Sequence, residues 1–184
     1  MDIQPWLSKQ AVDFLDSIVS EDSTIFEWGS GGSTLRYAPK AKRIVSIEND
    51  KSWYDKLLVE FKERGISNVE LKFIPNDNET SRDTLNLNSY SSNSLHYKHK
   101  VFRTYVKEID SHESFDLVIV DGRSRASCIM HAIDKVKVGG YIMLDDSERP
   151  YYNPGKDLLK NDKWEENILP GKGGGHTTFY KKLK

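Results

Sequence analysis

Short apolar runs typical of β-strands alternate with segments of helical character along most of this chain. Five runs have strand character, at residues 24–27, 43–47, 69–74, 115–120 and 141–144. A helical segment precedes the first run, and others separate each run from the next. Such alternation builds a parallel sheet whose crossover helices cover both faces, so the chain is predicted to be an α/β protein.

The last part of the chain departs from this alternation. Residues 164–169 and 177–181 are strand-like, and four glycines lie between them. No helix fits in that interval, so the two pieces are expected to pair as an antiparallel hairpin at one edge of the sheet. The predicted fold is therefore a three-layer sandwich with helices on both faces. Its Rossmann-like sheet is seven-stranded and mostly parallel, with an antiparallel C-terminal hairpin.

The length of 184 residues suits a single domain, taken here as residues 1–184. Residues 76–98 are rich in serine and asparagine and show no period. They are predicted to form a long surface loop that can close over a substrate as a lid.

Charge and cysteine content narrow the class of protein further. The formal net charge is −1, which provides no overall field to recruit nucleic acid or an anionic membrane. The single cysteine, Cys128, excludes an intrachain disulfide framework. The start of the chain lacks the pattern of a signal peptide, and the longest apolar run is too short to cross a bilayer. We therefore expect a cytoplasmic protein.

A glycine-rich turn follows the first strand. The chain runs from Glu27 through Trp-Gly-Ser-Gly-Gly to Ser33, where a helical segment begins. Glycines let the backbone of such a turn approach a ligand closely, and the next helix offers free N–H donors. The second strand ends at Glu48, nineteen residues after Gly29 (48 − 29), where a carboxylate can bind both hydroxyls of a ribose. The pattern predicts a nucleoside cofactor.

The details of the turn indicate which nucleoside. A dinucleotide fingerprint requires glycine at position 34, where this chain has Thr34. Glu27, two residues before the first glycine, is placed to meet an ammonium group. These residues resemble the first motif of class I S-adenosylmethionine-dependent methyltransferases, which is an acid, any residue, glycine, any residue and glycine. The resemblance covers residues 24–181, including the terminal hairpin. Ser33 departs from it, because the family usually has a third glycine there.

The resemblance implies that S-adenosylmethionine is the cofactor and that the ends of four strands bind it. The glycine turn would line its methionine moiety, Glu27 would serve the amino group and Glu48 the ribose. Asn76 or Asp77 would approach the adenine, and Asp121 would lie near the sulfonium and the acceptor. The implied cofactor residues are Glu27, Gly29, Ser30, Gly31, Glu48, Asn76, Asp77 and Asp121.

Acidic residues after the fourth and fifth strands indicate the kind of acceptor. The Asn/Asp-Pro-Pro-Tyr sequence of methylases that act on nucleobase amino groups is absent after the fourth strand. Asp121 with Asp145 and Asp146 is similar to the layout of divalent-cation-dependent O-methyltransferases. That similarity implies catalytic roles for Asp121 and Asp146, and Mg²⁺ or another divalent cation held by all three acids. Asp146 stands where those enzymes have an amide, and capping or solvated aspartates remain the alternative.

Basic and aromatic residues near these acids are candidate acceptor-binding groups. Guanidinium groups match carboxylates and phosphates, so Arg123 and Arg149 are predicted to bind the acceptor together with Tyr151. The segment 121–152 also resembles methyltransferase-like proteins associated with polysaccharide modification. We therefore expect O-methylation of a small-molecule or saccharide hydroxyl. Surface salt bridges are the alternative role for each arginine.

Two other functions are compatible with the sequence. One is an NAD(P)-dependent oxidoreductase, against which Thr34 and the terminal hairpin argue. The other is a non-catalytic module that keeps the nucleoside pocket without turnover. A third possibility is an aminopropyl transferase on the same fold, but this chain has no acidic signature that favours it.

Overall fold

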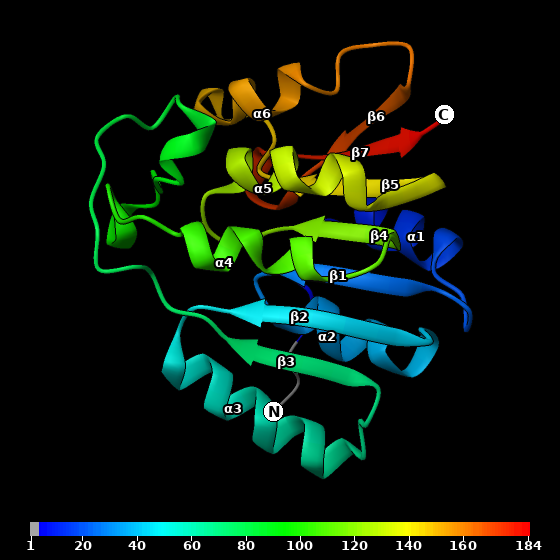
Figure 1. Cartoon of the computed structure of the whole chain (residues 1–184). Coiled ribbons are helices and arrows are strands. Elements are labelled where there is room, and N and C mark those ends of the chain that lie inside the picture. Colours follow the sequence, from blue (N-terminus) through cyan, green and yellow to red (C-terminus); the bar gives the residue numbers. More distant parts are fainter. Residues whose placement is uncertain (1–3) are drawn as a thin grey trace.

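The computed structural model describes residues 4–184, and its centre is one seven-stranded sheet (Figure 1). The strands are β1 (Thr24–Trp28), β2 (Arg43–Glu48), β3 (Val69–Phe73), β4 (Phe115–Val120), β5 (Val136–Asp145), β6 (Trp164–Pro170) and β7 (His176–Lys182). Their order across the sheet is β3-β2-β1-β4-β5-β7-β6. Strands β1 to β5 are parallel, while β7 pairs antiparallel with both β5 and β6. The predicted fold class, including the C-terminal hairpin, is confirmed.

Six α-helices accompany the sheet within the described part of the chain. They are α1 (Lys9–Ile18), α2 (Gly32–Tyr37), α3 (Lys51–Arg64), α4 (Arg103–Lys107), α5 (Arg125–Ala132) and α6 (Asn153–Asp157). Local signals explain their ends. Ser8 caps α1 by accepting from the Ala11 N–H at 3.1 Å, and Asp50 caps α3. Gly65 ends α3 in the left-handed conformation that favours glycine.

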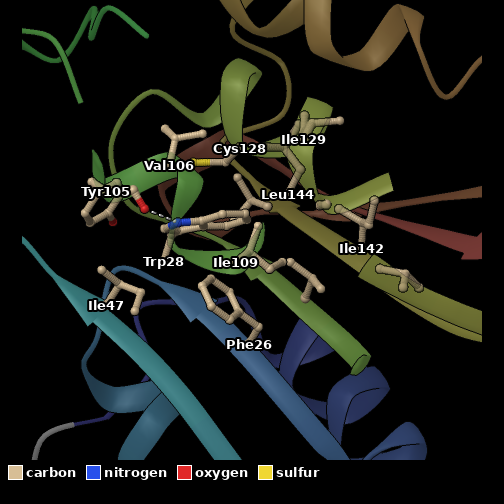
Figure 2. Close-up of a cluster of buried hydrophobic side chains, with 14 of the residues drawn as sticks. Phe26, Trp28, Ile47, Tyr105, Val106, Ile109, Cys128, Ile129, Ile142 and Leu144 are labelled. Carbon is tan, nitrogen blue, oxygen red and sulfur yellow. Dashed lines mark hydrogen bonds between the residues drawn. The ribbon is translucent and has the colours of Figure 1, made fainter. Parts of the chain in front are cut away.

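Alternate residues of the central strands contribute side chains to two hydrophobic cores, one on each face of the sheet. Phe26 and Trp28 point toward α4 and α5, and the buried Trp28 indole donates to the Tyr105 carbonyl at 2.9 Å (Figure 2). Ile25 points the other way and packs in a cluster with Leu15 of α1. Because the period of a strand is two, these alternating burials account for the three layers.

Two elements differ clearly from what the sequence predicts. The helical segment between the long loop and the fourth predicted strand is the short α4 followed by a 3-10 turn over Glu108–Ser111. The fifth strand begins five residues early, at Val136, and includes Gly139 and Gly140. A register shift between β4 and β5 accommodates this extension. Within residues 4–184, no helix has the length and apolar character needed to cross a bilayer.

The segment predicted as a lid is a long connection between β3 and α4, and its closure over a substrate stays a prediction. It lies beside the carboxyl ends of the parallel strands (green in Figure 1) and contains two short 3-10 helices. Tyr90 and Ser92 within it are buried, and the Tyr90 carbonyl accepts from Ser124 Oγ at 2.8 Å. In this structure the segment is therefore packed onto the turn after β4.

Candidate functional site

The strand order reverses between β1 and β4, so the turns that follow these two strands meet at the switch point where α/β sheets bind ligands. Gly29 has a φ of +96°, and a Cβ on it would lie 2.9 Å from the Asp121 carbonyl carbon. A Cβ on Gly122 would lie 3.0 Å from the backbone nitrogen of Gly29, and 1.9 Å from the Tyr105 hydroxyl oxygen. Both glycines are thus required by the contact between the two turns, before any ligand is considered.

The last glycine of the turn has a different neighbour. A Cβ on Gly32 would lie 2.3 Å from the carbonyl oxygen of Gln4, so the beginning of the described chain lies directly on this turn. Trp53 of α3 approaches from the other side, and its indole N–H donates to the Ser30 carbonyl at 2.8 Å. The glycine turn is therefore held between the N-terminal segment and α3.

Glu27 lies beneath the turn and is only 1% exposed. Its carboxylate accepts hydrogen bonds from the hydroxyls of Ser33, Thr34 and Ser46. Burial raises the pKa of Glu27, and these three hydroxyls oppose that shift. The two residues that depart from glycine fingerprints, Ser33 and Thr34, thus have a structural purpose as partners of Glu27. The structure does not place Glu27 on the wall of either cleft described next.

Two clefts adjoin the Ser30–Trp53 contact. The first, called the β2 cleft, is lined by Gly29, Ser30, Glu48, Asn49, Asp50, Ser52, Trp53, Asp121, Gly122 and Arg123. The second, called the N-terminal cleft, is lined by Gln4, Pro5, Trp6, Leu7, Gly29, Ser30, Gly31, Gly32, Ser33, Trp53, Ile119, Asp121 and Met143. Gly29, Ser30, Trp53 and Asp121 belong to both. The structure therefore brings the predicted glycine turn, Glu48 and Asp121 together.

Glu48 and Asn49 leave polar atoms unpaired in the β2 cleft. One carboxylate oxygen of Glu48, Oε1, accepts the backbone N–H groups of Asn49 and Asp50 at 2.6 and 2.7 Å. The other oxygen has no hydrogen bond within residues 4–184, and burial raises the pKa of Glu48 to about 7. Asn49 Oδ1 accepts from Arg123 Nε at 3.3 Å, while its buried Nδ2 has no partner among the described residues. A buried unpaired donor beside a free carboxylate oxygen fits a nucleoside ligand.

Asn76 and Asp77, expected at the adenine, lie on the wall of neither cleft. The Asp77 carboxylate accepts from the Thr104 hydroxyl at 2.6 Å and from the Thr104 N–H at 3.2 Å. It therefore supplies the N-terminal hydrogen bond that the first turn of α4 lacks locally. Asn76 Nδ2 donates to the Asp77 carbonyl at 2.8 Å.

The three acids predicted to hold a metal converge, but a guanidinium group lies among them. Arg125 Nη2 is 2.9 Å from Asp121 Oδ1, and Arg125 Nη1 is 3.3 Å from Asp146 Oδ2. Asp145 instead accepts from Thr177 Oγ1 at 2.7 Å. Within residues 4–184, no group of three or more histidine, cysteine or acidic side chains is arranged to hold a metal ion. The residues present therefore do not fit the divalent cation that the sequence pattern suggested.

Burial also affects the pKa of Asp121, which lines both clefts. Loss of hydration and the nearby carboxylates of Asp145 and Asp146 raise this pKa to about 7, while Arg125 opposes the shift. Near neutral pH the carboxyl group of Asp121 can therefore hold or release a proton.

The predicted acceptor-binding residues line a separate polar cavity. Its walls come from residues 84–94 of the long loop, residues 122–127 and residues 149–152. Arg149 Nη1 donates to the Tyr151 hydroxyl at 3.2 Å, and its Nη2 pairs with Asp146 at 2.9 Å. Arg123 lines both this cavity and the β2 cleft, and it forms no ion pair within the described chain. Arg123, Arg149 and Tyr151 thus line one cavity, and their binding of an acceptor stays a prediction.

Sequence reasoning missed three contributors to this region. Asn49 directly follows the predicted ribose acid, but asparagine at this position is equally typical of a helix cap. Trp53 is spaced like an apolar residue of α3, and such periodicity gives no signal for its hydrogen bond to the glycine turn. The N-terminal segment 4–7 reaches the turn by a contact between distant residues, for which one sequence offers no signal.

Comparison with known proteins gives a consistent picture of the fold. No protein-family model matches the sequence, and a search of curated proteins finds no match. Among solved structures, an rRNA methylase from Streptococcus thermophilus matches at a TM-score of 0.60 and 18% identity, covering 95% of each chain. A methyltransferase-like protein from Silicibacter pomeroyi matches at a TM-score of 0.67 and 18% identity, covering 99% of this chain and 90% of its own.

A third similar structure was solved with a ligand. It is a protein of Streptococcus mutans described as a methyltransferase and determined in complex with S-adenosylhomocysteine. It matches at a TM-score of 0.63 and 15% identity, covering 95% of this chain and 97% of its own. At these identities the likeness establishes a shared fold, the fold of class I S-adenosylmethionine-dependent methyltransferases.

Proposed function

We propose that this chain is an S-adenosylmethionine-dependent methyltransferase whose cofactor binds across the β2 cleft and the N-terminal cleft. The observation that carries the proposal is the pair Glu48 and Asn49, which offers a free carboxylate oxygen and an unpaired buried N–H beside the glycine turn. A ribose, which has two adjacent hydroxyls and a ring oxygen, complements that pair. The fold shared with methyltransferases supports the same assignment.

Each of the two clefts would bind a different part of the cofactor. Glu48 would accept hydrogen bonds from the ribose hydroxyls, and Asn49 would donate to an oxygen or ring nitrogen of the nucleoside. The methionine moiety would follow Gly29, Ser30 and Gly31 into the N-terminal cleft. We assign Glu27 to holding this turn in shape, because its partners Thr34 and Ser46 are hydrogen-bonded to Gly31 and Ser30 of the turn.

Asp121 lies where the two clefts meet, which is where the reacting groups would come together. Bound S-adenosylmethionine would supply an activated methyl group. With a pKa of about 7, Asp121 would accept the proton that an acceptor hydroxyl releases. Asp146 would contribute by fixing Arg125 and Arg149 rather than by contacting the acceptor.

The acceptor is proposed to be a small polar molecule, such as a saccharide, that is methylated on oxygen. Serine, threonine, asparagine, arginine and tyrosine dominate the walls of the polar cavity, so an apolar acceptor would find few partners there. Arg123 would bind the acceptor next to the cofactor, while Arg149 and Tyr151 would hold its far end.

Calorimetric titration with S-adenosylhomocysteine tests the proposal. The protein is expected to bind it, and Glu48→Gln should weaken binding roughly 10- to 100-fold, because a hydrogen bond to a charged group contributes about 1.5–3 kcal/mol. Glu63→Gln makes the same change on an exposed part of α3 and should leave the affinity unaltered.

NAD⁺ provides the contrasting ligand in the same experiment. Binding of NAD⁺ without binding of S-adenosylhomocysteine would overturn the methyltransferase proposal and favour an oxidoreductase. Tight binding of S-adenosylhomocysteine with no methylation of any acceptor in a broad polar panel would point to a module without turnover.

A further inference from the structure

We infer that Arg125 is a built-in cation of this site, occupying the place between Asp121 and Asp146 where the acid pattern would otherwise hold a divalent metal ion. The inference concerns only charged groups of the protein itself, so it does not depend on which cofactor binds.

The contacts of Arg125 involve all three nitrogens of its guanidinium group. Its two terminal nitrogens form ion pairs with the carboxylates of Asp121 and Asp146 at 2.9 and 3.3 Å. Its nitrogens also donate to three backbone carbonyls, those of Gly122 at 3.2 Å, Asp145 at 2.6 Å and Asp121 at 3.0 Å. The rigid fork of the guanidinium thus contacts five oxygen atoms, three of which accept hydrogen bonds.

The surroundings keep this side chain in place. Arg125 is 8% exposed, and its guanidinium carbon lies 5.6 Å from the centre of the Tyr152 ring. It begins α5, four residues after Asp121, so the turn after β4 delivers both members of the pair. A buried charge with such a complete set of partners is costly to displace, because moving it would leave both sides unpaired.

A divalent cation would need the same oxygen atoms. Magnesium and calcium bind carboxylate and carbonyl oxygens at about 2.0–2.6 Å, and the candidates here are those that Arg125 already contacts. Asp146 is engaged twice, since Arg149 Nη2 pairs with it at 2.9 Å. Asp145 points its carboxylate at Thr177 instead. Asp121 and Asp146 are therefore partners of arginines, and Asp145 is the partner of Thr177.

Titration with Mn²⁺, followed by its electron paramagnetic resonance signal, tests the inference without any need for activity. The wild-type protein should show no saturable binding up to millimolar Mn²⁺. Arg125→Met removes the guanidinium and leaves Asp121 and Asp146 facing each other, so it should gain a site at least tenfold tighter than any in the wild type. Adding Asp146→Asn to that variant should remove the gained site.

Two outcomes would overturn the inference. One is a single Mn²⁺ bound by the wild type, displaced by Mg²⁺ and lost in Asp121→Asn. The other is a folded Arg125→Met protein with no gain in Mn²⁺ affinity, because Arg125 would then not be what excludes the ion. If Arg125→Met does not fold, Arg125→Gln, which keeps N–H donors for the carbonyls, replaces it with the same expected gain. Binding of S-adenosylhomocysteine by the wild type is measured separately, so failure of the proposed function stays distinguishable.

Discussion

The two sides of Asp121 differ in how their polar groups are satisfied. On the cofactor side, Glu48 and Asn49 are buried and keep an oxygen and an N–H without partners in the described chain. On the side of β5, the acids are fully engaged, with Arg125, Arg149 and Thr177 as their partners. Unpaired buried groups are costly unless a ligand completes them, whereas paired ones need nothing further. The comparison teaches that an acid at a strand end marks a ligand site only when the protein leaves it incomplete.

Of the tests of the cofactor side, a substitution in the glycine turn should have the largest effect. Gly29→Ala adds a Cβ at a φ of +96° and 2.9 Å from the backbone of Asp121, so it should lower the free energy of unfolding by about 3 kcal/mol. Urea denaturation measures the loss. Gly173→Ala, at a φ of +75° with open space around it, isolates the backbone strain and should cost only about 1 kcal/mol. Equal losses in the two variants would mean that the two turns do not pack as described.

The pH dependence of S-adenosylhomocysteine binding tests the role of Glu48. Its pKa of about 7 means that the carboxyl group is protonated below neutrality, while ribose hydroxyls bind best to the ionised form. Lowering the pH from 8 to 6 should therefore weaken S-adenosylhomocysteine binding about tenfold, measured by calorimetry. Glu48→Gln should remove most of this dependence, and a profile that survives the substitution would assign it to another group.

The raised pKa of Glu48 affects folding stability in the opposite direction to its effect on binding. The folded protein binds the Glu48 proton more tightly than the unfolded chain, whose ordinary value is 4.5. The contribution of this group to stability is therefore present at low pH and is lost as the pH rises from about 4.5 through about 7. Denaturation of the wild type and Glu48→Gln across that range would measure it.

Asp77 follows β3 and already has a partner in Thr104, so its substitution gives the smallest effect and tests the rule drawn from the comparison. Because its carboxylate caps α4 through Thr104, Asp77→Ala should lower the free energy of unfolding by about 1 kcal/mol. Its affinity for S-adenosylhomocysteine should be unchanged. Asp83→Ala, in the same loop and without a side-chain hydrogen bond in the described chain, should change neither quantity. A clear loss of affinity in Asp77→Ala alone would restore this residue to the adenine site.

The sequence was informative where local patterns decide the structure. The apolar runs, the terminal hairpin and the glycine turn followed by Glu48 were all predictable, because strand periodicity and turn chemistry depend on neighbouring residues. The candidate acceptor residues Arg123, Arg149 and Tyr151 line one polar cavity, and their role in binding an acceptor stays a prediction.

Long-range partners account for what could not be predicted. Asp77 meets Thr104, twenty-seven positions away (104 − 77), and Arg125 meets Asp146, twenty-one positions away (146 − 125). In each case an acid at a strand end is compatible with ligand binding. Only the folded chain shows that a residue of the protein itself is its partner. Ser33 and Thr34 appeared as departures from a motif, although both bind Glu27.

The contact between the turns at Gly29 and Asp121 has a consequence for how the site comes into being. These residues are ninety-two positions apart (121 − 29), so a growing chain has no cofactor site until β4 has been synthesised and placed beside β1. A ligand that spans both turns binds only chains in which they have met. At one hundred times its dissociation constant it would add about 2.7 kcal/mol to the completed sheet. Supply of the cofactor would thus lengthen the lifetime of finished molecules while leaving fragments shorter than β4 unprotected.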